Sequence, residues 1–274
     1  MTLKSRPGRQ LKPTPIASLY TSRLQKGGAL LEDMRALVRH WQDVGINGQQ
    51  YRVIAANLLG KQTRARAADT LRRAFMPRFV TGRPPQAWRI VRALEDHNVP
   101  LDILRPVYYW ITARSEPLLY DFVSTELLAR SKSQTQSVTT EDVSAWVSSQ
   151  LAQCGKHWSE AVTTKVAQGM LATLRDFGIL EGTSKKRIAP AYLPVESFAY
   201  IAFALYYEGV SGPRLVQHRD WLLFLFSSSA VEHTFLEADR NGLLRFQAAG
   251  RIIRIDFPAI SFTEMADVIA ARAH

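Results

Sequence analysis

The stretch "PLDILRPVYYWITARSEP" (residues 100–117) indicates the fold class of this 274-residue chain. A proline opens it, as in many helices, because the first helical residue needs no backbone N–H donor. Apolar residues then recur at three- and four-residue spacing, which places them on one helical face. The next segment, 117–131, repeats this plan, and the same spacing extends back to Gly28. Since no alternating strand pattern precedes residue 178, we predict a mostly α-helical protein.

We expect four parts along the chain. They are a basic, flexible arm (1–26), a helical bundle that contains a basic helix (27–133), a winged-helix-like domain (138–210), and a C-terminal portion with a helix and a β-hairpin (211–274). The polar linker "SKSQTQSVTTEDVS" (131–144) marks the main boundary, and Thr140 is the candidate cap of the helix that follows.

The order of elements after this linker predicts the winged-helix-like domain. Two helices, 140–153 and 159–177, precede "FGILEGTSKKRIAPAYL" (177–193), which resembles two extended segments joined by a basic turn. Such modules commonly bind duplex DNA, but they also serve as protein-docking domains. Further on, apolar and polar residues alternate in "LLRFQAAGRIIRIDF" (243–257), which predicts a β-hairpin, and a last helix is expected over 262–272.

The formal net charge of +11 is concentrated in the first third of the chain. Residues 1–92 carry 18 Lys+Arg and 4 Asp+Glu, a net charge of +14, whereas residues 93–274 carry 17 and 20, a net charge of −3. An asymmetry of this kind favours a polyanionic partner for the basic part.

Cysteine use and hydropathy predict a cytoplasmic protein with no membrane contact. A single cysteine, Cys154, leaves no internal disulfide and is typical of a reducing compartment. The first thirty residues lack the apolar core of a secretory signal. The longest apolar runs, 198–207 and 221–226, fall well short of the roughly 20 residues that a membrane-spanning helix needs. We therefore predict that both runs are buried helices.

The segment "GKQTRARAADTLRRAFMPRF" (60–79) holds six basic residues but one acid, Asp69. We expect a helix over 62–76 with Thr63 as its candidate cap. On a wheel of about 100° per residue for residues 61–75, Lys61, Arg66, Arg72 and Arg73 share one arc, although Arg64 falls on the apolar side. A merely solvated helix, the first alternative, usually mixes charges for i,i+4 pairing. Arginine instead suits phosphate, because its guanidinium can hold two oxygens. An anionic membrane is the second alternative, but the apolar face is mostly alanine, which inserts poorly.

These arguments define the candidate DNA-binding residues. They are Lys61, Arg64, Arg66, Arg72, Arg73, Arg78 and Arg83 in the basic helix and its flank, and Lys185, Lys186 and Arg187 in the basic turn.

No catalytic motif is present in the sequence. It contains neither a phosphate-binding G-x-x-x-x-G-K-[ST] loop nor a G-x-S-x-G nucleophile elbow. Cys154 and His157 have the spacing of metal ligands, but no second Cys/His pair could complete a zinc site. We therefore expect a protein that is not an enzyme and that uses no metal or cofactor.

Four blocks carry a resemblance to a known family. They are "YTSRLQKGGALLEDMRALVRHW" (20–41), "NLLGKQTRARAADTLRRAFMPRF" (57–79), "PLLYDFVSTEL" (117–127) and the region 158–201 with "KVAQGMLATLRDFGILEG". Over roughly residues 20–205 the chain is similar to the BrxA proteins of BREX (bacteriophage exclusion) loci. The resemblance implies a small, helical, non-enzymatic protein that binds duplex DNA beside the system's methyltransferase, ATPase and phosphatase-like subunits. The family's basic block matches the residues from Lys61 to Arg78.

The sequence thus predicts a DNA-binding accessory protein of phage defence, which contacts duplex backbone through the basic helix with weak sequence preference. Two alternatives stay open. The basic face could dock an acidic subunit of the same system, or the protein could be an RNA-binding helical bundle.

Overall fold

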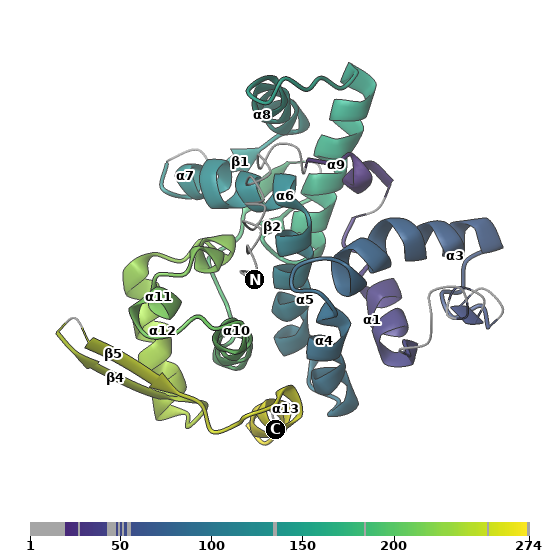
Figure 1. Ribbon diagram of the computed structural model, residues 1–274. Helices are drawn as coiled ribbons and strands as arrows, with labels where there is room; N and C mark the ends of the chain where they lie inside the picture. The colour runs from purple at the N-terminus through teal and green to yellow at the C-terminus, as the bar shows by residue number, and fades with distance from the viewer. Residues whose placement is uncertain are drawn as a thin grey trace, which may run out of the picture.

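The computed structural model describes residues 20–26, 28–42, 48, 50, 52–53, 56–133, 136–183, 185–250 and 252–272 (Figure 1). Its first helical elements are the 3₁₀-helix η2 (Arg23–Lys26), α1 (Leu31–His40), α3 (Arg64–Thr70), the π-helix η3 (Leu71–Val80), α4 (Ala87–Asp96), α5 (Leu101–Ser115), α6 (Pro117–Asp121), the π-helix η4 (Phe122–Leu127) and α7 (Leu128–Ser131). Later helices are α8 (Thr140–Ala152), α9 (Glu160–Asp176), α10 (Val195–Tyr207), α11 (Pro213–Val216), the 3₁₀-helix η5 (Arg219–Phe224), α12 (Ser228–Arg240) and α13 (Phe262–Ala270). The described chain is mostly helical, as predicted.

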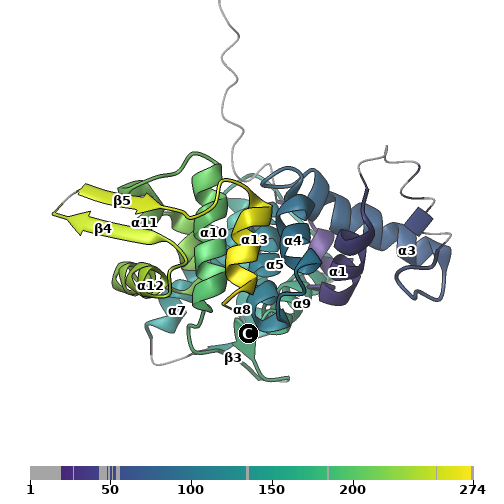
Figure 2. The same ribbon diagram turned by 90° about the horizontal axis from the view of Figure 1, so that it is seen from below.

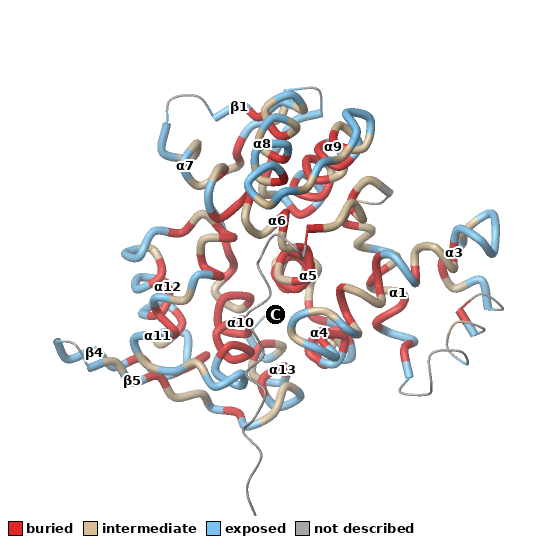
Figure 3. Tube along the Cα trace, turned by 45° about the horizontal axis from the view of Figure 1, so that its top comes forward, coloured by how far each residue is buried: buried red, intermediate tan, exposed pale blue. Residues whose placement is uncertain are grey.

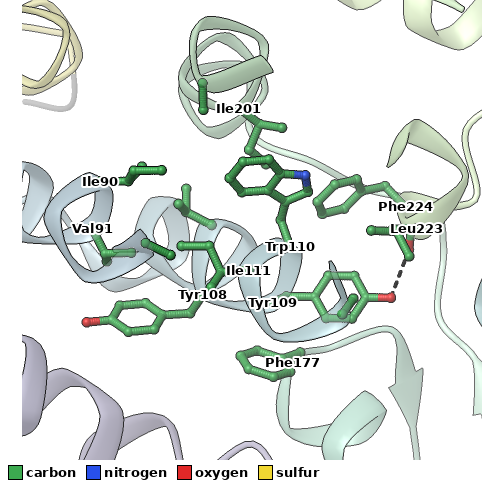
Figure 4. Packing of buried hydrophobic residues seen from close by; sticks show 14 of the residues in the cluster. Ile90, Val91, Tyr108, Tyr109, Trp110, Ile111, Phe177, Ile201, Leu223 and Phe224 are labelled. Atoms are coloured by element: carbon green, nitrogen blue, oxygen red, sulfur yellow. Dashed lines mark hydrogen bonds between the residues drawn. The ribbon is translucent and has the colours of Figure 1, made fainter. Parts of the chain in front are cut away.

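Helix α5, formed by residues of the stretch 100–117, lies at the centre of the molecule (Figures 1 and 3). Tyr108, Tyr109, Trp110 and Ile111 are all fully buried, so successive residues face the interior in every direction. A helix that is apolar all round has to be enclosed by other elements. Neighbouring helices accordingly surround α5, with α4 on one side and α10 on another (Figures 1 and 4).

Helix α10 confirms the prediction that the apolar run 198–207 is a buried helix. Nine consecutive residues, from Ser197 to Leu205, are buried. The buried hydroxyl of Ser197 is satisfied, because Ser197 Oγ donates to the Ile103 carbonyl oxygen of α5 at 2.7 Å. The second apolar run, 221–226, is also largely buried, but it forms the end of η5 and a left-handed residue, Leu225, rather than an α-helix.

The N-terminal segment packs on a helix far along the chain. Residues 20–26 fall inside the predicted flexible arm, yet η2 lies against α9, and Leu24 is buried there. Gly169 of α9 makes this contact possible, because a Cβ at that position would lie 1.9 Å from the Leu24 carbonyl oxygen. Tyr20 adds a hydrogen bond from its hydroxyl to Asp121 at 2.8 Å. Residues 1–19 of the predicted arm lie outside the described residues.

A small antiparallel sheet accompanies α8 and α9. It contains β1 (Ser137–Val138), β2 (Leu180–Glu181) and β3 (Lys186–Ile188) in the order β1-β3-β2. Strand β1 precedes residue 178 although no alternating pattern does, because its two residues are too few to show one. The helix cap also shifts by one residue: Thr139, not Thr140, forms a capping box with Asp142. Two helices followed by two strands do occur as expected, whereas the assignment to the winged-helix class stays a prediction.

The C-terminal hairpin is confirmed. Strands β4 (Arg245–Ala249) and β5 (Ile252–Asp256) pair in antiparallel register, with Gln247 opposite Arg254, and Gly250 adopts a left-handed φ of 61° at the turn. The hairpin and α3 lie at opposite ends of the molecule (Figures 1 and 2). Helix α13 then returns to pack on α10 and α4.

One hydrophobic cluster contains buried residues from all of these regions, so the predicted boundaries near 133 and 210 do not divide the core. Within the described part of the chain, no helix is both long enough and apolar enough to cross a bilayer.

Candidate nucleic-acid interface

Helix α3 presents the basic segment at one end of the molecule (Figures 1 and 3). Thr63 begins it as the sequence predicts, because the Thr63 side-chain oxygen accepts a hydrogen bond from the Arg66 backbone N–H at 3.3 Å. Ala67 faces the interior, whereas residues 62–66 are exposed and colour pale blue in Figure 3. A short, well-capped helix therefore positions Arg64 and Arg66 toward solvent.

The helix widens after Thr70. Residues Leu71–Val80 form a π-helix, in which backbone hydrogen bonds run from residue i to residue i−5. Thr81 closes the segment with such a bond, from its N–H to the Met76 carbonyl oxygen at 2.8 Å. Pro77 has no N–H to donate, so an ordinary α-helix would lose a bond there. The buried residues of this segment, Leu71, Ala74, Phe75, Arg78 and Phe79, still recur at three- and four-residue spacing, so one buried face continues through it.

Arg78 is the main departure from the predicted site. Its side chain is 1% exposed, and Nε donates to Glu116 Oε1 at 3.2 Å. The Nη1 atom donates to the carbonyl oxygens of Gly28 and Ala29. The side chain therefore points into the protein, where it cannot contact the backbone of a bound duplex. We therefore correct the prediction and remove Arg78 from the candidate interface.

The remaining cations of this region differ in whether they have acidic partners. Lys61 pairs with Asp33 at 2.7 Å, and Arg73 pairs with Asp69, the single acid of the segment. Among the described residues, the side chains of Arg64, Arg66 and Arg83 have no ion pair. Arg72 has no ion pair either, and its Nε atom donates a hydrogen bond to the Ala68 carbonyl oxygen at 3.4 Å. These four arginines are exposed.

The basic turn lies apart from α3 (Figures 1 and 2). Lys185 is exposed, Lys186 donates from Nζ to the Thr183 carbonyl oxygen at 3.0 Å, and Arg187 pairs with Glu181 at 3.0 Å. The structure therefore does not bring Lys185, Lys186 and Arg187 into one cluster with the α3 cations.

One basic residue near α3 was not selected from the sequence. Arg23 of η2 lines the same cavity as Lys61, Arg66 and Arg73. The only signal in the sequence was its place in a basic N-terminal segment, because nothing there shows that η2 folds back beside α3.

The described residues hold no group of three or more His, Cys, Asp or Glu side chains placed to bind a metal. Cys154, which was considered for such a site, donates its thiol hydrogen to the Gln150 carbonyl oxygen at 2.9 Å.

The fold and this surface define a mostly helical protein with a small antiparallel sheet and with exposed arginines on α3 and at the start of η3. The chain belongs to the BrxA family, because the BrxA family model matches residues 18–204. This match confirms the resemblance found over roughly residues 20–205, and it supports a role associated with a BREX phage-defence system. Neither the curated proteins nor the solved structures contain a match to the chain.

Proposed function

We propose that this protein is a non-enzymatic component of a BREX system that binds duplex DNA in the cytoplasm, mainly through backbone phosphates. The observation that carries the proposal is that Arg64, Arg66 and Arg72 are all exposed and have no acidic partner among the described residues. Arg83 and the paired cations Lys61 and Arg73 extend this surface.

Unpaired arginines favour a polyanion over simple solvation. Surface helices usually balance cations with acids three or four residues away, and here only Arg73 has such a partner. A guanidinium binds two oxygens of one phosphate with geometry that an ammonium lacks. Because phosphate contacts position a protein without reading bases, we expect weak sequence preference. The exposed Lys185 and the adjoining Lys186 and Arg187 supply a second proposed contact, and the partner subunits would be the methyltransferase, the ATPase and the phosphatase-like protein.

Charge reversal tests the proposal. We expect the triple variant Arg64→Glu, Arg66→Glu and Arg72→Glu to lose binding to random-sequence duplex in an equilibrium gel-shift assay. The matched control reverses Arg214, Arg240 and Arg245, which are also exposed and without ion pairs among the described residues, but which lie in the C-terminal portion. Both variants change the net charge by the same amount.

Each outcome of this comparison indicates which partner the basic surface binds. Loss of duplex binding in the α3 variant alone supports the proposal, and equal loss in both variants contradicts it. If the α3 variant keeps its DNA affinity but no longer co-purifies with an acidic BREX subunit, the surface is a protein-docking site. Tighter binding to hairpin RNA than to duplex DNA would instead favour the RNA-binding alternative.

A further inference from the structure

A cavity of about 320 Å³ lies between Arg23 of η2 and the consecutive helices α3 and η3. Its charged lining residues are Arg23, Lys61, Arg66, Asp69, Arg73 and Arg78. Five of these six side chains are cationic, and they come from η2, from the residues before α3, and from the consecutive helices α3 and η3. The cavity therefore concentrates positive charge next to α3.

The acids around the cavity neutralise only part of this charge. Asp69 pairs with Arg73, Asp33 pairs with Lys61, and Glu116 is shared by Arg23 and Arg78. Five cations thus face three carboxylates, which leaves an excess of two positive charges. The Arg66 side chain is the one cation of the cavity without an acidic partner among the described residues.

One of the cations that line the cavity, Arg23, has an unsatisfied hydrogen-bond donor. The Nε atom of Arg23 is buried and has no hydrogen-bond partner, although the Arg23 Nη2 atom donates to Ser115 and Glu116. A buried donor without an acceptor is unfavourable, and natural proteins contain few such groups. Arg23 is thus held in place by two contacts while a further donor stays unsatisfied.

We propose that this cavity binds a phosphate monoester. A monoester carries about −1.5 to −2 charges at neutral pH and three acceptor oxygens, which matches the excess of two positive charges. An internal phosphodiester carries a single charge and matches it less well. The phosphate monoester could belong to a 5′-phosphorylated DNA end or to a free nucleotide. For the DNA end, the inference rests on the proposed function.

The test compares two blunt 12-base-pair duplexes that differ only in a 5′-phosphate or a 5′-hydroxyl at each end. We expect the wild-type protein to bind the phosphorylated duplex about tenfold more tightly, as the gain of charge-assisted hydrogen bonds predicts. Arg66→Gln should abolish this difference. The matched control is Arg64→Gln, because Arg64 is also exposed on α3 without an ion pair but does not line the cavity. Arg64→Gln should weaken the binding of both duplexes equally, so that the preference for the phosphorylated duplex remains.

Competition separates the two sources of the phosphate. Displacement of the phosphorylated duplex by 5′-dAMP and by inorganic phosphate, but not by deoxyadenosine, identifies a site that accepts free phosphate esters. Preference for the phosphorylated duplex without such displacement identifies a site for DNA ends. Equal affinity for both duplexes together with no effect of 5′-dAMP overturns the inference and leaves the proposed function standing. Binding of 5′-dAMP without affinity for either duplex supports the cavity and overturns the duplex proposal instead.

Discussion

Arg78 and Glu116 form an ion pair at 3.2 Å in which both side chains are almost completely buried. Glu116 also accepts a hydrogen bond from Arg23 Nη2 at 3.3 Å, so one carboxylate connects η2, the π-helix and the junction of α5 with α6. Glu95 has a similar role beside α1, where it forms ion pairs with Arg35 and Arg39. Part of the positive charge of the first third thus serves the fold rather than a partner.

Removing the Glu116 carboxylate should destabilise the protein strongly. We expect Glu116→Gln to lower the free energy of unfolding by about 3–5 kcal/mol, because it leaves the buried Arg78 guanidinium without its counter-charge. Urea denaturation measures this loss. The matched control is Glu181→Gln, which breaks the exposed pair with Arg187 and should cost about 0–1 kcal/mol. Equal losses in the two variants would contradict the structural role assigned to Arg78.

The contact between η2 and α9 depends on the absence of a side chain at Gly169. We expect Gly169→Ala to lower the free energy of unfolding by about 1–3 kcal/mol, because its Cβ would collide with the Leu24 backbone. Faster trypsin cleavage after Arg23 should accompany this loss. The neighbouring exposed substitution Gln168→Ala should change stability by no more than about 0.5 kcal/mol. A Gly169→Ala variant as stable as the wild type would show that η2 does not dock as described.

Apolar periodicity predicted the longer helices and the hairpin well, because the residues that pack into the core recur there at the spacing of the local structure. The spacing in 100–117 corresponds to α5, the run 198–207 to α10, and the alternation in 243–257 to the hairpin β4–β5. Each of these segments carries enough residues for its period to emerge. Strand β1 has only Ser137 and Val138, and it exists because β3 pairs with it.

The candidate site was harder to predict, because its residues depend on backbone geometry and long-range contacts. Continued past residue 75, a wheel of 100° per residue places Arg78 on the same arc as Leu71, Ala74 and Phe75, and the structure buries these side chains. Arg78 was assigned to the interface by its charge alone, which does not show where the side chain points. Arg23 reaches the cavity only because η2 folds back on α9. By contrast, Arg64 and Arg66 lie in the regular turn after Thr63, where a local capping signal was sufficient.

The link between α4 and α13 should depend on pH through His97. Its Nδ1 atom lies 2.6 Å from the Ala93 carbonyl oxygen and its Nε2 atom 2.7 Å from Asp267 Oδ1, so both ring nitrogens face acceptors. The hydrogen bond to Ala93 raises the pKa of His97, desolvation partly opposes it, and the carboxylates of Asp267 and Asp96 raise it further. Only the protonated ring donates at both positions.

Because the folded pKa is raised above the unfolded value of about 6.5, this stabilisation is fully present below that value. It is lost as the pH rises through the folded pKa. We therefore expect His97→Gln to lower the midpoint of thermal unfolding more at about pH 5.5 than at about pH 9. The control, His233→Gln, removes an exposed histidine without an ion pair among the described residues and should show no such dependence. A His97→Gln effect that is equal at both pH values would exclude the charged ring as the cause.

Salt dependence should distinguish the arginines that contact phosphate from those that do not. Each phosphate contact releases condensed counterions, so the slope of log affinity against log salt changes by about 0.9 per contact. We expect Arg64→Gln and Arg72→Gln each to reduce the steepness of this slope by about that amount for random duplex. Arg73→Gln should reduce it less, because Asp69 already pairs with that guanidinium. Arg214→Gln, far along the chain, should leave the slope unchanged. Weaker binding by the Arg64 and Arg72 variants with an unchanged slope would mean that these side chains do not contact phosphates.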